Sequence, residues 1–108
     1  MKKNYEFRRL YSKGTFASTP LMAVYVRRNR TDRNKLGLTV STKLGNAVTR
    51  NRIRRRLREI YRLHEREFQH GYDIVIVGRN TIGQAEYHRI EADFLRLSDK
   101  LGLRSAEI

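Results

Sequence analysis

The chain of 108 residues contains no cysteine, and this absence excludes several kinds of site at once. Disulfide bonds, thiolate metal sites and cysteine nucleophiles all require the missing residue. The sequence also lacks an apolar run long enough to span a bilayer, and its first residues, MKKNYEFRRLYSKG, lack the apolar segment of a secretory signal peptide. We therefore expect a cytoplasmic protein that makes no contact with a membrane.

Negative charge is scarce as well. The chain has 11 Asp and Glu residues against 24 Lys and Arg residues, which gives a formal net charge of +13. A basic balance of this size indicates a polyanionic partner such as a nucleic acid. Hydrophobic residues make up 39% of the chain and are patterned, which favours a folded domain over a disordered basic tail. Residues 1–108 offer room for a single domain with one modest core.

The first half of the chain predicts a helix followed by two strands. Residues 5–12 place Phe7 and Tyr11 on one side of a short helix. The alternating run LMAVYVRR, residues 21–28, predicts a strand with Met22, Val24 and Val26 on its core face. The polar stretch NRTDRN is expected to be a hairpin turn into a second strand at residues 35–41.

The second half predicts a long helix, a strand and a final helix. Asn46 can cap the long helix, whose apolar stripe is expected to contain Ile53, Leu57, Ile60, His64 and Phe68. The strand YDIVIVGR is apolar on both faces and so is expected to be central, and residues 85–101 predict the last helix. A long helix between two strands favours a crossover between parallel neighbours. The predicted fold is a two-layer α+β domain with a small mixed sheet and the order α-β-β-α-β-α.

Residues 43–66, KLGNAVTRNRIRRRLREIYRLHER, are the most informative segment. They hold one lysine and eight arginines but only two glutamates. A solvated surface helix would normally carry more Glu partners at i, i+4, and a membrane-surface helix would keep its apolar side free of the core. Guanidinium groups bind phosphate oxygens in pairs and stack on bases. The segment therefore favours a nucleic-acid surface on one face of the helix.

The outer face of the predicted sheet offers a second candidate surface. Alternation places Tyr25 on the face that also carries Gly37, Thr39 and Ser41. An aromatic ring among small hydroxyl groups can stack an unpaired base and bind a backbone. Phe7 and Tyr11 would form the other wall of such a groove, or would simply pack the first helix against the sheet. The residues alone leave both alternatives open.

The string LGNAVTRNRIRRRLREIYR resembles the signature of the bacterial ribonuclease P protein subunit family, with Arg50-Asn51-Arg52 as its core. The segments EFRRLYSKG, MAVYVRR, LGLTVSTK and YDIVIVGR also fall where that family has comparable ones, although Tyr11 stands where Phe is common. The family's protein is the small partner of a catalytic RNA, and together they remove the 5′ leader of precursor tRNA. The resemblance also implies a ribosomal-protein-like fold with a left-handed β-α-β crossover, contrary to the general rule.

The resemblance implies two sets of site residues and a set of partners. The residues expected to bind the RNA subunit are Lys43, Asn46, Arg50, Asn51, Arg52, Arg54, Arg55, Arg56, Arg58 and Arg62. The residues expected to bind the leader are Phe7, Tyr11, Tyr25, Thr39 and Ser41. The implied partners are the ribonuclease P RNA and precursor tRNA, with one protein monomer for each RNA subunit. Mg²⁺ is expected to be held by RNA phosphates and not by a protein site.

Catalysis by the polypeptide itself is not expected. A protein nuclease would need paired carboxylates or a pair of histidines, and no spacing brings His64, His70 and His88 together. The protein is thus expected to be the non-catalytic subunit of an RNA-based endoribonuclease. A ribosomal-type structural RNA-binding protein is the alternative, and a stand-alone nuclease is a further one from another class.

Overall fold

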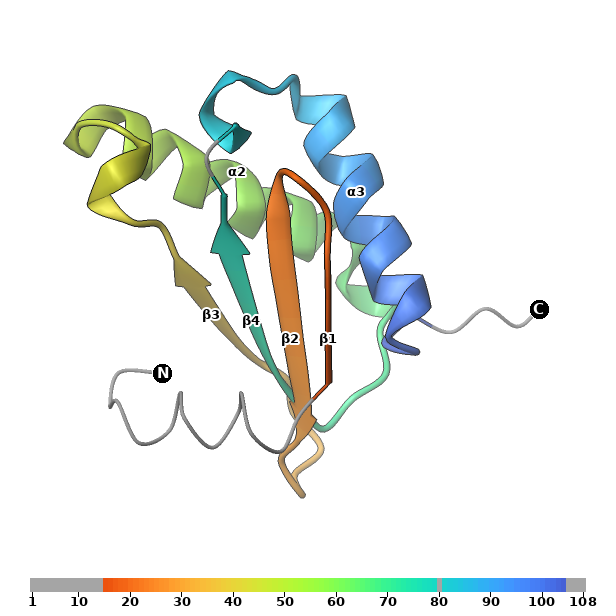
Figure 1. The fold of residues 1–108 in the computed structure, drawn as a ribbon. Helices are drawn as coiled ribbons and strands as arrows, with labels where there is room; N and C mark the ends of the chain where they lie inside the picture. The colour runs from red at the N-terminus through yellow and green to blue at the C-terminus, as the bar shows by residue number, and fades with distance from the viewer. Residues whose placement is uncertain (1–14, 80, 105–108) are drawn as a thin grey trace.

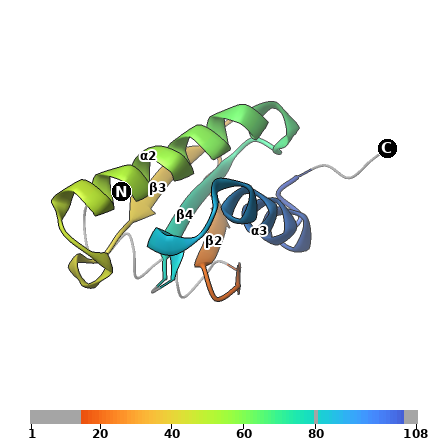
Figure 2. The same ribbon diagram turned by 90° about the horizontal axis from the view of Figure 1, so that it is seen from above.

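A computed structural model describes residues 15–79 and 81–104 of the chain. It shows a four-stranded mixed sheet with two helices packed on one face, which confirms the two-layer α+β class (Figures 1 and 2). The helix expected at residues 5–12, with Phe7 and Tyr11, lies outside the described residues. The strands and α-helices are β1 (Thr15–Ser18), β2 (Met22–Arg28), β3 (Lys35–Thr39), α2 (Ala47–His64), β4 (Tyr72–Gly78) and α3 (Tyr87–Lys100).

The strand order is β1-β2-β4-β3, with β4 antiparallel to β2 and parallel to β3. The predicted hairpin between β2 and β3 is therefore wrong, because β4 lies between these two strands. Their connection passes the start of β4 and is bonded to it. The backbone N–H of Asn29 donates to the Gly71 carbonyl at 2.9 Å, and that of Tyr72 donates to Asn34 Oδ1 at 2.9 Å. These bonds hold the connection beside the strand that separates β2 from β3.

The segment β3-α2-β4 forms the predicted crossover between parallel neighbours. In Figure 1 both strands point upward, β4 lies to the right of β3, and α2 passes behind the sheet. This arrangement is left-handed, as the family resemblance implied and contrary to the usual rule. Its consequence is positional. A right-handed crossover would have placed α2 on the opposite face from α3, whereas here both helices share one face (Figure 2).

The core lies between that face and the two helices. One row of partners across the sheet is Ala17, Val24, Ile76 and Leu38, and the first three of these side chains are buried. The helices contribute the buried residues Ile53, Leu57, Ile60 and Tyr61 from α2 and Ile90, Phe94 and Leu97 from α3. Strand β4 pairs on both sides, as its apolar sequence predicted.

Two local predictions need correction. Helix α2 ends at His64, so Phe68 does not continue its stripe. Phe68 instead reaches the core from a separate segment that bridges to Arg104, and it packs edge-on against Phe94 with ring centroids 5.7 Å apart. Leu21 was predicted to be the first residue of the strand at residues 21–28, but it precedes β2 and is buried in the core.

Candidate nucleic-acid interface

The turn between β3 and α2 builds the start of the basic helix. Strand β3 ends at Thr39, so the prediction that this strand includes Ser41 is wrong. Ser41 is exposed and caps the short 3₁₀ helix η1 (Thr42–Leu44), where its Oγ accepts from the backbone N–H of Lys43 at 3.1 Å. Gly45 follows with φ 140°, a conformation that favours glycine.

Asn46 caps α2 as predicted, because its Oδ1 accepts from the backbone N–H of Thr49 at 2.9 Å. The Nε of Arg50 donates back to the Gly45 carbonyl at 3.2 Å, which orients this side chain along the turn. Val48, in the first turn of α2, is 75% exposed, so this end of the helix is open to solvent. The helix start thus presents the positive end of the helix dipole next to the arginines.

The residues predicted to bind RNA line the solvent side of α2 and its N-terminal turn. Six of them are exposed: Lys43, Asn46, Asn51, Arg55, Arg58 and Arg62. Four are half-buried: Arg50, Arg52, Arg54 and Arg56. Within residues 15–79 and 81–104, no arginine of α2 takes part in an ion pair; the arginines in such pairs are Arg27, Arg89, Arg96 and Arg104. The positive charge of α2 is therefore left uncompensated by the fold.

Two side chains of the Arg50-Asn51-Arg52 motif make contacts with other groups of the protein. Asn51 Oδ1 accepts from Arg54 Nη1 at 2.9 Å and so orients that guanidinium group. Arg52 Nη2 lies 3.4 Å from the Gly83 carbonyl in the 3₁₀ helix η3 (Ile82–Gln84), while its Nε is buried without a partner in the described structure. Arg52 thus spans from α2 toward the chain that leads into α3.

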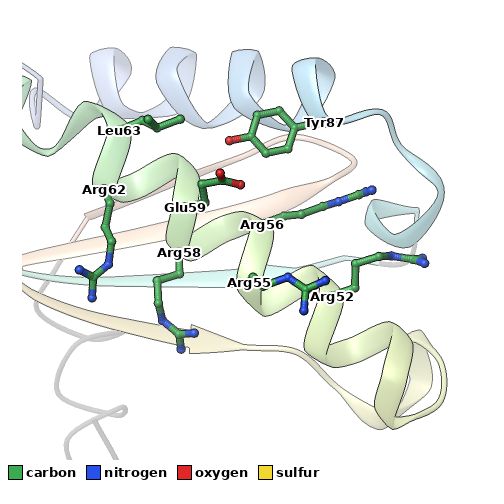
Figure 3. A pocket seen from close by; sticks show the side chains of 8 residues that line it. All are labelled: Arg52, Arg55, Arg56, Arg58, Glu59, Arg62, Leu63 and Tyr87. Carbon is green, nitrogen blue, oxygen red and sulfur yellow. The ribbon is translucent and has the colours of Figure 1, made fainter.

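An open groove of about 670 Å³ lies on the surface of α2 beside the first turn of α3, which contributes Tyr87. Its lining consists of five arginines, Glu59, Leu63 and Tyr87 (Figure 3). Figure 3 shows the Tyr87 ring extending from α3 toward Glu59, with Arg52 and Arg56 on the same side and Arg58 and Arg62 pointing away. Burial, followed by the negative charges of Glu59 and Glu91, raises the pKa of Tyr87, so its hydroxyl stays protonated.

On the opposite sheet face, Phe16 and Tyr25 form a stacked pair. Their ring centroids are 5.2 Å apart and their planes are inclined by 22°. Phe16 is 61% exposed, and Tyr25 is half-buried. The two residues continue across the sheet through Val75 to Gly37, in one row of partners. Thr39 faces the same side from β3, two strand spacings or about 10 Å from β2.

Phe16 was missed from the sequence because β1 was missed. The strand has only four residues, TFAS, and a short strand gives a weak periodic signal. Its alternation was nevertheless present: Ala17 is buried, whereas Phe16 and Ser18 are exposed. Of the predicted leader-binding residues, the structure places Tyr25 and Thr39 on this face, puts Ser41 beyond the end of β3, and does not describe Phe7 and Tyr11.

The histidines do not form a catalytic pair. His64, at the end of α2, lies with Nε2 2.7 Å from Glu91 Oε2 and Nδ1 3.0 Å from Glu67 Oε2. The hydrogen bond to Glu91, with a further contribution from Glu67, raises the pKa of His64 against the effect of burial. His64 is therefore held between two carboxylates and is not simply packed. Among the described residues, no group of three His, Asp or Glu side chains could hold a metal ion.

Fold and charge together define a small basic α+β protein with a left-handed crossover and an uncompensated arginine helix. The Ribonuclease P family model matches residues 1–102 of the chain. The chain therefore belongs to the ribonuclease P protein family, and this membership assigns it to ribonuclease P and tRNA processing. No helix in the described residues has the length and apolar character needed to cross a membrane.

Individual relatives agree with this family. The chain is 39% identical to the "Ribonuclease P protein component" of Natranaerobius thermophilus, over 93% of this chain and 87% of that protein. It is also 39% identical to the protein of the same description from Clostridium botulinum strain Loch Maree, over 95% and 94%. The solved RNase P protein of Staphylococcus aureus superposes with a TM-score of 0.87 at 31% identity, covering 97% of this chain and 96% of that one. The Thermotoga maritima RNase P protein gives a TM-score of 0.83 at 25% identity, covering 93% and 94%.

Proposed function

We propose that the chain is the protein subunit of a cytoplasmic ribonuclease P ribonucleoprotein, in which a catalytic RNA removes the 5′ leader from precursor tRNA. One protein monomer would bind one RNA subunit. The observation that carries the proposal, beside family membership, is the set of arginines on α2 that the described fold leaves without carboxylate partners. A folded helix with this much unpaired charge is stabilised when a polyanion lies along it.

The solvent side of α2 is the proposed docking surface for the RNA subunit. Arg55, Arg58 and Arg62 are exposed and can each bind phosphate oxygens in bidentate fashion. Lys43 and the helix start extend the same surface toward β3. Each phosphate neutralised in this way releases counterions, so binding is expected to weaken steeply as salt rises.

The outer sheet face is the proposed site for the single-stranded leader. The stacked rings of Phe16 and Tyr25 offer a flat aromatic surface on which unpaired bases can stack. Because mature tRNA has no leader, contacts on this face would favour the precursor over the product. Phe7 and Tyr11 remain predicted members of the same site.

Mg²⁺ is assigned to the RNA subunit and the substrate phosphates in this proposal. Divalent ions can activate water and stabilise a leaving oxygen during phosphodiester hydrolysis. The protein contributes charge and position: its arginines offset repulsion between RNA phosphates, which lowers the Mg²⁺ concentration that the RNA needs. The polypeptide therefore acts on binding and not on the chemical step.

Reconstitution with a ribonuclease P RNA tests the proposal directly. Cleavage of a precursor tRNA by the RNA should rise on addition of the protein at a Mg²⁺ concentration at which the RNA alone is nearly inactive. The protein alone should leave the same precursor intact. Absence of stimulation would refute the proposal, and RNA-free cleavage at the leader junction would replace it with a protein nuclease.

A ribosomal-type structural RNA-binding protein is the second candidate, since a basic helix would serve it equally. Such a protein has no need of an exposed aromatic pair on the sheet. The exposure of Phe16 on the face away from α2 therefore favours a protein with two separate RNA contacts. A protein that bound ribonuclease P RNA but did not discriminate precursor from mature tRNA would support the structural alternative.

A further inference from the structure

The flank of α2 that faces α3 carries an ordered row of side chains. Arg52, Arg56, Glu59 and Leu63 are spaced at i, i+4, i+7 and i+11, so they lie along one side of the helix. In this direction the row changes from two cations to a carboxylate and then to an apolar group. Tyr87 faces the row from α3 (Figure 3). The groove is therefore basic at one end and apolar at the other.

The apolar end of this groove is unusual for a surface helix. Leu63 is 61% exposed, although the other side of α2 already supplies the core with its apolar residues. The half-buried Tyr87 ring also lines the groove, and it packs partly against the core and edge-on to His88. An apolar side chain and an aromatic ring at the wall of a basic groove provide a surface for a flat, uncharged ring system.

The basic end of the groove suits a phosphate. Arg52 and Arg56 both extend along this flank (Figure 3). From Arg56 to Leu63 the helix advances by about 10 Å. That length is enough to hold a phosphate at one end of the groove and a base at the other.

Glu59 lies between these two ends and, among the described residues, is the one acid in the lining. Its charge helps to raise the pKa of Tyr87, which also lines the groove, and acceptor positions of the carboxylate are open to a ligand. Among the RNA bases only guanine presents two adjacent N–H donors, N1–H and N2–H, on its Watson–Crick edge, where unpaired bases are read. A carboxylate can accept both of these bonds at once.

We propose that the groove between α2 and α3 binds one unpaired nucleotide of RNA, with its phosphate at Arg52 and Arg56 and its base against Tyr87 and Leu63, and that Glu59 makes guanine the preferred base. The inference rests on the proposed function only in taking that RNA to be the subunit that lies along α2. It adds a base-reading contact to a helix that otherwise binds phosphates, and this site is separate from the aromatic pair on the opposite face.

The test uses the full chain and five probes: GMP, AMP, CMP, UMP and inorganic phosphate. Binding is followed by NMR at the Leu63 methyl groups and the Tyr87 ring, while signals of Phe16 and Tyr25 report on the other face. GMP should shift the groove signals at a concentration at least about fivefold lower than CMP or phosphate does, since stacking and a carboxylate contact add to the phosphate contact. Groove signals that respond to phosphate and GMP at the same concentration would overturn the proposal, leaving an anion site only.

Variants separate the parts of the site. Tyr87→Ala should weaken GMP binding by about fivefold or more, and Tyr87→Phe, which keeps the ring, should weaken it less. Glu59→Gln should abolish the preference for GMP over AMP. Retention of that preference would show that Glu59 only relieves charge repulsion between neighbouring arginines. Arg66→Ala, outside the groove lining, is the charge-matched control for Arg56→Ala, and circular dichroism confirms that each variant is folded.

Cleavage assays with the RNA subunit distinguish this inference from the proposed function. If the wild-type protein stimulates cleavage but shows no guanine preference at the groove, the groove proposal alone fails. If GMP binds the groove selectively but no stimulation of the RNA is seen, the assignment to the ribonucleoprotein fails and the nucleotide site stands.

Discussion

The rings of Phe16 and Tyr25 stack across two neighbouring strands, 5.2 Å apart, on the face of the sheet that carries neither α2 nor α3. The basic helix and the aromatic pair therefore lie on opposite faces of the sheet. A protein arranged in this way can lie against one RNA with α2 and hold a second, single-stranded segment on its sheet. Changes at the two faces should consequently have separable effects.

Loss of either ring should affect precursor binding and not mature tRNA binding. We expect Tyr25→Ala to weaken the affinity of the assembled ribonucleoprotein for precursor tRNA by about fivefold or more, because base stacking on an aromatic ring contributes about 1–3 kcal/mol. Phe16→Ala should act in the same direction. Equilibrium binding of precursor and mature tRNA checks this, and an equal loss for both would exclude a leader contact.

Removal of an exposed arginine from α2 should change the salt dependence of RNA binding. Arg55→Ala is expected to weaken binding to the RNA subunit and to reduce the slope of log K against log salt by roughly 0.7–0.9, the value for one neutralised phosphate. Arg96→Ala is the matched control, because Arg96 lies on α3 and pairs with Asp93 at 3.1 Å. Equal slopes for Arg55→Ala and the wild type would argue against a phosphate at Arg55.

The carboxylates around His64 should make stability depend on pH. The pKa of His64 is raised from 6.5, so its contribution is complete below that value and is lost as pH rises through the raised pKa. The pKa of Glu67 is lowered from 4.5, mainly by its bond to His64, so its contribution is complete above that value and is lost as pH falls through the lowered pKa. The cluster therefore contributes most between pH 4.5 and 6.5.

Thermal unfolding of His64→Gln checks this window. The variant should melt below the wild type by about 2–5 °C near the middle of the window, because partly exposed ion pairs are individually weak. The difference should shrink as pH rises through the raised pKa of His64, because the side chain then loses its charge. His70→Gln, at an exposed histidine outside the cluster, is the control. A difference that stays constant across this range would contradict the ion-pair account.

Gly71 should tolerate substitution much less well than Gly102. Both have positive φ, 93° and 73°, but a Cβ at Gly71 would lie 2.7 Å from the Thr31 carbonyl oxygen, whereas one at Gly102 would meet nothing within 4 Å. We expect Gly102→Ala to lower the free energy of unfolding by about 1 kcal/mol and Gly71→Ala by clearly more, about 2–3 kcal/mol. Urea denaturation of both variants measures the free energy of unfolding. Equal decreases for the two variants would show that the segment between β2 and β3, which contains Thr31, can shift to make room for a Cβ at Gly71 without loss of stability.

The sequence predicted the basic helix well because charge and apolar spacing coincide there. Ile53, Leu57 and Ile60 are buried as the 3.6-residue period required, and all the arginines of the helix lie outside this buried stripe. What these arginines contact stays a prediction. The groove to α3 could not be foreseen, since it depends on where Tyr87 comes to lie and no pattern within α2 encodes that.

The strand order shows where local signals fail. A polar loop of six residues between two alternating runs is typical of a hairpin, and this led to the wrong pairing of β2 with β3. The apolar character of β4 on both faces indicated instead that β4 is central. A strand that is central among three must separate the other two, so β2 and β3 could not be paired. Only a comparison of the two signals, one local and one over the whole sheet, would have resolved the conflict.

The position of β4 in the sheet also determines when the sheet can form during synthesis of the chain. It is the last strand in the chain and yet the one that joins β2 to β3, so neither side of the sheet can be completed until residue 78 has been synthesised. Until then the apolar stripe of α2 has no finished surface to cover, and β3 has no partner strand. Such non-local pairing slows folding and leaves the unfinished chain prone to aggregation. The arginine helix therefore leaves the ribosome before β4, the strand that completes the sheet beneath it.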